Sequence, residues 1–331
     1  MHSVLTEIPD IGSVRAAANR IAGVAVRTPL LTSLALQEQL GLFLFVKAES
    51  LQRTGSFKFR GAYNALSQFD ETQRKKGVVA CSSGNHAQGV AEAARILGIA
   101  ATIVMPSDAP ATKLQRTRRS GANVVLYERY GEDRIAIAMG ISERTGAAFL
   151  HPYEDARVIA GQGTCGLEIC EQMHEGGIRP DRVLVCTGGG GLTAGICLAV
   201  RDRFPDTVIH TVEPAGFDDT RRSLQAGRIL ANQDPGYSAC DALLSPSPGT
   251  LSFEINRKCA GEGLVVTDEQ AFQAMRVAFD EFRLVVEPGG AVALAALLAH
   301  AAEWQGQQVV AVLSGGNVDA DLFSRVLTGE L

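Results

Sequence analysis

Short apolar runs alternate with longer amphipathic stretches along almost the whole chain. The apolar runs are residues 42–46, 77–81, 101–105, 123–127, 182–186, 207–212 and 308–313, and the helical stretches are residues 56–69, 86–97, 111–120, 132–145, 192–204 and 220–226. Strands that alternate with helices at this spacing form βαβ units, whose strands are parallel. The pattern therefore predicts an α/β fold with mainly parallel sheets and helices on both faces.

Three turns that are rich in glycine or serine follow predicted strands. They are residues 82–86, 188–191 and 314–317. In parallel α/β sheets, ligands bind outside the carboxyl ends of the strands, where these turns lie. The alternation breaks between residues 146 and 153, which we interpret as a crossing between two domains.

Length and composition indicate a globular protein rather than a disordered or fibrous one. The chain has 331 residues, of which 46% are hydrophobic and 20% are charged, so a large core can form. At roughly 150 residues per domain, this length suggests two domains. A formal net charge of −5 argues against a nucleic-acid-binding protein, because such proteins usually carry a basic face.

The sequence lacks the features of a secreted or membrane protein, which indicates a soluble one. Residues 1–10 lack the basic start and apolar run of a signal peptide, and the apolar stretch 291–302 is too short to span a bilayer. The seven cysteines are scattered, without the spacing of a zinc site. We therefore expect a reduced, cytoplasmic protein that binds neither membranes nor nucleic acid.

The glycine loop, Gly188 to Gly191, follows a predicted strand and precedes a helix that begins at Leu192. Without Cβ atoms, backbone N–H groups can converge on an anion, and a helix N-terminus adds a favourable dipole. This favours a phosphate site over a tight turn, for which fewer glycines would suffice. Residues 189–194 also match the dinucleotide pattern G-x-G-x-x-A, and Glu213 ends the next strand, so an NAD-dependent oxidoreductase stays open.

Lys58 is the best candidate nucleophile in the sequence. Only six of the 31 basic residues are lysines, and Lys58 follows Ser56, a residue type that favours the N-cap of a helix. In the first helical turn, between Phe57 and Phe59, burial would lower the pKa of the amine. A neutral amine can form a Schiff base with an aldehyde. The alternative is an ordinary lysine on the surface of an amphipathic helix.

Four segments of the chain are informative when taken together. They are Ser-Phe-Lys-Phe-Arg-Gly-Ala (56–62), Ser-Ser-Gly-Asn-His-Ala-Gln-Gly (82–89), the glycine loop, and Ser-Gly-Gly-Asn (314–317). Together they resemble the serine/threonine dehydratase family of fold-type II pyridoxal-phosphate enzymes, which includes threonine and serine ammonia-lyases and serine racemases. The similarity runs from about residue 27 to residue 319. Four motifs in the right order are more specific than one dinucleotide pattern.

The resemblance implies an architecture and an assembly. The fold would consist of two open, mainly parallel twisted sheets with helices on both faces. Residues 1–50 and 151–331 would form a large domain that binds the cofactor, and residues 51–150 would form a small domain. Most members of the family are homodimers, so we expect a homodimer.

The resemblance also assigns residues to the cofactor, pyridoxal 5'-phosphate. Lys58 would bind it as a Schiff base and, once an amino acid displaces the lysine, would remove the α-proton. The phosphate would be bound by Gly188, Gly189, Gly190, Gly191 and Leu192. Phe57 would pack on the ring, Asn85 would bond the ring hydroxyl, and Ser314 would face the ring nitrogen. Because a serine hydroxyl is neutral, it stabilises a pyridinium less than an aspartate would, which favours β-elimination over transamination.

Substrate residues follow from the same resemblance. Ser82, Ser83, Asn85 and His86 would receive the substrate carboxylate. Ser83 aligns with the residue that protonates the opposite face of the α-carbon in the racemising members, which makes it a second candidate catalytic residue.

Residues 213–219 resemble the divalent-cation segment of the metal-dependent members of the family. Glu213 and Asp219 would supply carboxylates, and Phe217 its backbone carbonyl, to Mg²⁺ or Ca²⁺, which prefer oxygen ligands. The alternative is a helix N-terminus with acidic residues that binds no metal.

The resemblance favours elimination of water from a β-hydroxy amino acid, L-threonine or L-serine, which gives a 2-oxo acid and ammonia. A serine racemase and a 3-hydroxyaspartate dehydratase stay open, and so does a catalytically inactive relative that only binds phosphate. The NAD-dependent oxidoreductase becomes a remote alternative. The expected partner is a small amino-acid substrate.

Overall fold

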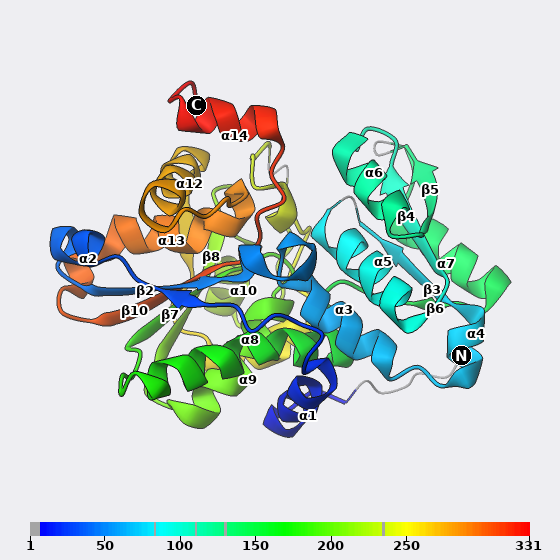
Figure 1. The fold of residues 1–331 in the computed structure, drawn as a ribbon, viewed down its shortest axis with the longest axis horizontal. Helices are drawn as coiled ribbons and strands as arrows, with labels where there is room; N and C mark the ends of the chain where they lie inside the picture. Colours follow the sequence, from blue (N-terminus) through cyan, green and yellow to red (C-terminus); the bar gives the residue numbers. More distant parts are fainter. Residues whose placement is uncertain (1–6, 83, 110, 129–130, 234–235) are drawn as a thin grey trace.

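The computed structural model describes residues 7–82, 84–109, 111–128, 131–233 and 236–331. Within these ranges the strands form two sheets (Figure 1). The six-stranded sheet has the order β1 (Leu30–Leu31), β2 (Phe43–Ala48), β10 (Gln308–Leu313), β7 (Arg182–Cys186), β8 (Val208–Pro214) and β9 (Leu264–Val266). The four-stranded sheet has the order β5 (Asn123–Tyr127), β4 (Ala101–Pro106), β3 (Val78–Cys81) and β6 (Ala148–Phe149). Neighbouring strands are parallel, except that β1 is antiparallel to β2.

Helices surround both sheets. Those within residues 51–150 are α3 (Lys58–Ser67), α4 (Glu71–Lys76), α5 (Asn85–Leu97), α6 (Ala111–Arg119) and α7 (Arg134–Thr145). The others are α1 (Ile11–Ile21), α2 (Leu34–Leu40), α8 (Ala156–Glu175), α9 (Gly191–Arg203), α10 (Asp219–Ala226), α11 (Thr250–Cys259), α12 (Asp268–Phe282), α13 (Pro288–His300) and α14 (Ala320–Leu327). Short 3-10 helices are η1 (Glu49–Leu51), η2 (Arg53–Gly55), η3 (Asp241–Leu243) and η4 (Ala301–Trp304).

Each sheet is buried on both faces. In β10, Val309 and Ala311 pack in the apolar cluster of α12 and α13, whereas Val310 and Val312 pack in the cluster of α8 and α9 on the opposite face (Figure 1). Residues 78–81 of β3 alternate in the same way between the cluster of α3 and α5 and the cluster of α7. This period of two places helices on both faces, as βαβ units require.

The predicted α/β fold with two mainly parallel sheets is confirmed, and all predicted strands are present to within two residues at either end. Strands β1, β6 and β9 were not predicted, because they have two or three residues each and are too short to show a periodicity. The strands of the smaller sheet all fall within residues 51–150. The division of the chain into a large and a small domain stays a prediction.

The predicted helix cap at Ser56 was wrong. Helix α3 begins at Lys58, its N-cap position is Phe57, and no side chain caps it. Ser56 is instead extended, with φ −162° and ψ 159°, because its backbone forms an isolated β-bridge to Gly315. The bridge therefore takes the place of a local cap.

Helix α8 packs against α3 on one side and against α9 on the other, through glycines. A Cβ atom added to Gly161 would lie 2.6 Å from the Cα of Gly61 on α3, and one added to Gly195 on α9 would lie 2.4 Å from the backbone nitrogen of Gly163. These separations leave no room for a larger residue, so backbone packs on backbone. Because α3 begins at Lys58 and α9 follows the glycine loop, α8 sets the distance between the lysine and the loop.

No described helix is both long enough and apolar enough to cross a membrane. The homodimer and the cytoplasmic location stay predictions.

Candidate active site

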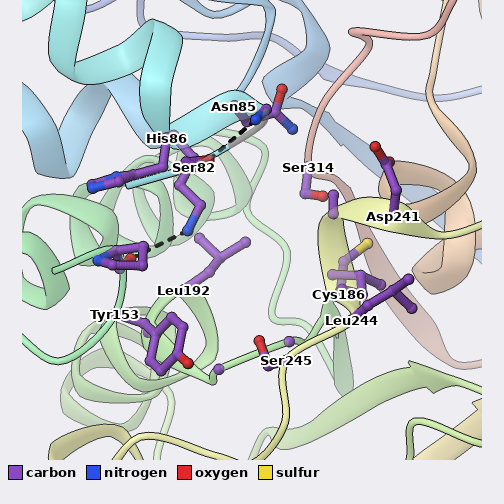
Figure 2. Close-up of a pocket in the computed structure, with 18 of the residues that line it drawn as sticks. Ser82, Asn85, His86, Tyr153, Cys186, Leu192, Asp241, Leu244, Ser245 and Ser314 are labelled. Atoms are coloured by element: carbon purple, nitrogen blue, oxygen red, sulfur yellow. Dashed lines mark hydrogen bonds between the residues drawn. The ribbon is translucent and has the colours of Figure 1, made fainter. Parts of the chain in front are cut away.

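A single pocket brings together the three turns that the sequence analysis placed at strand ends. The turns after β3, β7 and β10 all open into it, and α3 contributes Lys58 (Figure 2). The lining residues are Phe57, Lys58, Cys81, Ser82, Gly84, Asn85, His86, Arg134, Pro152, Tyr153, Cys186, Gly188, Gly189, Gly190, Gly191, Leu192, Asp241, Ala242, Leu243, Leu244, Ser245, Glu287 and Ser314. The pocket therefore lies at the carboxyl ends of strands from both sheets, where ligands bind in parallel α/β folds.

Lys58 has the environment of a reactive amine. Its Nζ donates a hydrogen bond to the carbonyl oxygen of Pro152 at 3.2 Å and lies 5.1 Å from the centre of the Phe57 ring. Burial disfavours the ammonium form and lowers the pKa of Lys58 to about 8. A substantial fraction of the amine is therefore neutral in mildly alkaline solution.

The chain before Lys58 is fixed to the turn that carries Ser314. Besides the bridge from Ser56 to Gly315, the N–H of Phe57 donates to the carbonyl of Ser314 at 3.1 Å. Gly55 has a left-handed φ of 75°, and a Cβ atom there would lie 2.7 Å from Oδ1 of Asn317. These contacts place the lysine beside Ser314, although more than 250 residues separate them in sequence.

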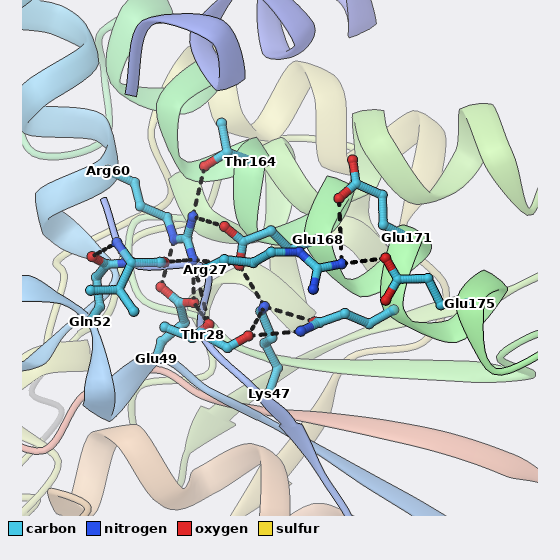
Figure 3. Close-up of polar contacts among 12 residues, drawn as sticks. Arg27, Thr28, Lys47, Glu49, Gln52, Arg60, Thr164, Glu168, Glu171 and Glu175 are labelled. Carbon is cyan, nitrogen blue, oxygen red and sulfur yellow. Dashed lines mark hydrogen bonds and ion pairs between the residues drawn. The ribbon is translucent and has the colours of Figure 1, made fainter. Parts of the chain in front are cut away.

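Two residues after Lys58, the buried Arg60 fixes α3 to its neighbours (Figure 3). Its guanidinium donates to both carboxylate oxygens of Glu49 in η1, at 2.7 Å each, and to both oxygens of Glu168 on α8, at 2.6 and 2.8 Å. The ammonium of Lys47, which is also buried, donates to Glu168 at 2.6 Å. Two cations thus balance two carboxylates, and this four-charge cluster is neutral as a whole.

The glycine loop has the geometry of an anion site. Gly190 has a left-handed φ of 88°, and a Cβ atom on Gly189 would lie 2.3 Å from the ring of Tyr153. The carbonyl of Gly189 accepts from Ser252 at 2.6 Å, and that of Gly190 accepts from Asn256 at 3.2 Å. Among the described residues, none accepts a hydrogen bond from the N–H groups of residues 188–190. The loop therefore presents free donors at the N-terminus of α9, a cradle that fits a phosphate.

Asn85 and Ser314 lie on the side of the pocket away from Tyr153 and Ser245 (Figure 2). Asn85, the first residue of α5, donates through Nδ2 to Glu287 at 2.5 Å and accepts from Asn317 at 2.7 Å. Ser314 is held through its backbone, whose N–H donates to the carbonyl of Gly290 at 3.2 Å. Both residues are thus fixed by their neighbours.

His86 is neutral at physiological pH. Its Nε2 donates to the carbonyl of Leu150 at 3.2 Å, and Nδ1 is buried with no partner among the described residues. Burial and the nearby Lys58 lower the pKa of His86 to about 3.

The hydroxyl of Ser82 accepts a hydrogen bond from the N–H of Gly84 at 3.1 Å. Ser83 lies outside the described residues, so its predicted part in catalysis and substrate binding stays a prediction.

Glu213 and Asp219 form a pair of buried carboxyl groups outside the pocket. Glu213 accepts from the N–H groups of Thr220 and Arg221, each at 2.8 Å. Asp219 accepts from Asn232 at 2.6 Å through Oδ1, whereas its Oδ2 is buried without a partner in the described part of the chain. Burial raises the pKa of Glu213 to about 8 and that of Asp219 to about 6, and the charge of Asp219 adds to the effect on Glu213.

A cation would relieve this accumulation of buried negative charge, so the residues fit an oxygen-ligated metal ion. No group of three or more histidine, cysteine, aspartate or glutamate side chains that could hold a metal occurs among the described residues. The predicted site does not require three such side chains, because its third ligand is the backbone carbonyl of Phe217.

Five polar residues of the pocket were not predicted from the sequence, which are Arg134, Tyr153, Asp241, Ser245 and Glu287. None of them lies in a glycine-rich turn or a recognised motif. Arg134 is the first residue of α7, and Asp241 and Ser245 lie in or next to η3. Packing of distant segments, rather than a local pattern, brings them to the site.

Comparisons with known proteins show the family to which the chain belongs. The model of the family "Pyridoxal-phosphate dependent enzyme" matches residues 21–315. The chain is 45% identical over 313 residues to L-threo-3-hydroxyaspartate ammonia-lyase of Pseudomonas sp, covering 95% of this chain and 97% of that protein. It is 39% identical to the serine racemase of Schizosaccharomyces pombe, covering 97% of this chain and 98% of the relative.

Among solved structures, a threonine deaminase from T.th. matches with a TM-score of 0.88 and 45% identity, covering 94% of this chain and 99% of that one. These findings decide against the NAD-dependent oxidoreductase, because the dinucleotide pattern at residues 189–194 falls within the matched pyridoxal-phosphate family. The chain belongs to the pyridoxal-phosphate dependent enzymes, in the fold-type II group that contains ammonia-lyases (dehydratases) and serine racemases.

Proposed function

We propose that this protein removes water from a β-hydroxy amino acid and releases a 2-oxo acid and ammonia. One observation carries the proposal: the buried amine of Lys58, with its lowered pKa, shares a pocket with a glycine loop whose N–H groups are free. An aldehyde-reactive amine and a phosphate cradle are the two attachments that pyridoxal 5'-phosphate requires.

The remaining contacts suit the same cofactor. The amine of Lys58 would attach to the aldehyde, the glycine loop and Leu192 would hold the phosphate, and Asn85 would donate to the ring hydroxyl. Phe57 would pack on the ring, and Ser314 would face the ring nitrogen. When bound, the cofactor supplies an electron sink for the charge that develops at the substrate α-carbon. Nζ of Lys58, once freed by the substrate, accepts the α-proton, because it is the lining amine whose pKa lies near working pH.

The substrate carboxylate would bind at the start of α5, near Ser82 and Asn85. The helix N-terminus favours an anion there, and the neutral imidazole of His86 adds no charge of its own. Ser83 stands beside these residues in sequence and is proposed as a further contact. The cation site at Glu213, Phe217 and Asp219 is proposed to hold Mg²⁺ or Ca²⁺ as a structural ion.

Arg134 favours a substrate with a second carboxylate. Of the lining bases, Lys58 would be attached to the cofactor and His86 is neutral, which leaves the guanidinium of Arg134 as a positive charge for the substrate. No described residue forms a hydrogen bond or ion pair with it, although its charge is near enough to lower the pKa of His151. A methyl group, as in threonine, would leave this charge unpaired in the pocket.

We therefore propose 3-hydroxyaspartate as the preferred substrate, rather than the L-threonine or L-serine that the sequence analysis favoured. The 45% identity to a relative named L-threo-3-hydroxyaspartate ammonia-lyase supports this choice. Relatives named L-threonine ammonia-lyase, at 40% identity, make threonine the main competitor to test.

The Lys58 amine makes cofactor binding depend on pH. Protonation blocks its attack on the aldehyde, so the binding rate of pyridoxal 5'-phosphate to the cofactor-free protein should rise with pH and level off above about 8. Stopped-flow absorbance at a series of pH values measures this rate. A rate that keeps rising up to pH 10.5, the ordinary pKa of a lysine, would contradict the proposed role of burial. Lys58→Ala, as the control, should show no such phase.

Replacing Arg134 tests substrate choice. Arg134→Met should lower kcat/KM for L-threo-3-hydroxyaspartate by about 10- to 100-fold, the effect of losing a charged hydrogen bond. It should change kcat/KM for L-threonine much less, because threonine has no second carboxylate. Release of 2-oxo acid measures both reactions. Arg144→Met, which removes an exposed arginine at the other end of α7, is the matched control. Equal losses with both substrates would rule out a carboxylate contact.

The buried carboxyl pair predicts stabilisation by a divalent cation. Adding Mg²⁺ or Ca²⁺ at about 100 times its Kd should raise the unfolding free energy by about 2.7 kcal/mol, because the ion binds only the folded state. Thermal unfolding with the cation and with a chelator measures the effect. Asp219→Asn should abolish it, whereas Asp218→Asn, which removes a neighbouring carboxylate paired with Arg222, should not. An unfolding temperature that changes with neither the cation nor the chelator would refute the site.

A further inference from the structure

Two cysteines outside the pocket lie on the neighbouring helices α9 and α11. Cys197 is buried in the middle of α9, and Cys259, the last residue of α11, is only half-buried. Both pack in the apolar cluster that contains Ile255 and Val200, and each thiol shifts the pKa of the other. All cysteines of the chain are free, so this pair is a dithiol.

Arg201 holds Cys259 against the side of α9 that carries Cys197. Its Nε and Nη2 donate to the carbonyl oxygen of Cys259 at 3.1 and 2.7 Å. Arg201 follows Cys197 by four residues, so the two side chains lie on the same face of α9. The guanidinium thus fixes the end of α11 beside the buried thiol.

The two thiols differ in reactivity. The Cys197 thiol, together with the charges of Arg201 and Lys258, outweighs burial and lowers the pKa of Cys259 to about 7. The interaction with Cys259 and burial raise the pKa of Cys197 well above its ordinary value. Since the thiolate is the nucleophilic form, Cys259 is suited to attack an oxidant, and Cys197 to react with the product.

We propose that Cys197 and Cys259 form a reversible disulfide when a peroxide reaches the protein. The thiolate sulfur of Cys259 attacks one peroxide oxygen, the O–O bond breaks, and hydroxide leaves, which gives a sulfenic acid. The sulfur of Cys197 then bonds to the sulfur of Cys259, and the sulfenic oxygen leaves as water with the Cys197 proton. The peroxide is reduced by two electrons, which the two sulfurs supply.

The disulfide would tie together the two helices that hold the glycine loop. Helix α9 begins at Gly191, and Ser252 and Asn256 on α11 bind the carbonyls of Gly189 and Gly190. A covalent bond between the two helices resists their separation, and with it any movement of the loop away from α11. Oxidation should therefore slow release of the cofactor phosphate. This consequence rests on the proposed function of the loop, whereas the disulfide itself does not.

Peptide mapping of the intact holoenzyme tests the disulfide. After hydrogen peroxide treatment and tryptic digestion without reductant, residues 183–201 should be joined to residues 259–276, with the loss of two hydrogens. Fragmentation must assign the bond to Cys197 rather than to Cys186, which lies on the same peptide. Dithiothreitol should reverse the bond, and Cys259→Ser and Cys197→Ala should abolish it. Cys170→Ser, at another buried cysteine, should retain it.

Detection of oxidised Cys259 with no bond to Cys197, in the folded wild-type protein, would overturn the proposal.

The predicted effect on cofactor release has its own measurement, which is the rate at which bound pyridoxal 5'-phosphate is lost to a scavenger, followed by absorbance. The rate should fall several-fold in oxidised wild type and stay unchanged in peroxide-treated Cys259→Ser. Equal rates in cross-linked and reduced protein would refute the effect on the loop. A protein that cross-links but binds no cofactor would refute the proposed function and leave the cysteine pair standing.

Discussion

The buried ion pairs of Arg60 are the constraint on which the pocket depends. Arg60 lies two residues from Lys58 and is bonded to Glu49 and Glu168, so one side chain joins α3 to η1 and α8. Removing one partner from a buried ion pair costs about 3–5 kcal/mol, because the other charge is left without compensation. The position of the lysine is therefore coupled to the stability of the core around it.

A second set of contacts fixes the other side of the pocket. The bridge from Ser56 to Gly315 joins the chain before the lysine to the turn after β10, and the glycine contacts of α8 bring α3 and α9 to a fixed separation. Backbone contacts of this kind cannot adjust as side chains do. The Lys58 amine, the glycine loop and Ser314 thus come from distant parts of the sequence but are held in one rigid arrangement.

Much of this arrangement could be predicted from the sequence, for a physical reason. Parallel strands end at the same edge of a sheet, so the glycine-rich turns after the neighbouring strands β7 and β10 had to lie side by side. The turn after β3 belongs to the smaller sheet and joins them through the packing of the two sheets. Lys58 could be singled out because lysine is rare in this chain and this one is flanked by phenylalanines.

Other features had no local signal. Strand β6 has two residues, and its pairing with β3 depends on the rest of the sheet. The bridge that displaces the expected Ser56 cap joins residues far apart in the chain. Arg134 and Glu287 reach the pocket only through tertiary packing, so their part in it follows from the structure alone.

The most direct test of the account is where the cofactor attaches. Protein loaded with pyridoxal 5'-phosphate is reduced with borohydride, digested with trypsin and analysed by mass spectrometry. The account predicts a pyridoxyl group on Lys58, within a peptide of residues 54–60 that trypsin no longer cleaves after the modified lysine. An unmodified Lys58, with the adduct on another lysine such as Lys47 or on none, would contradict it.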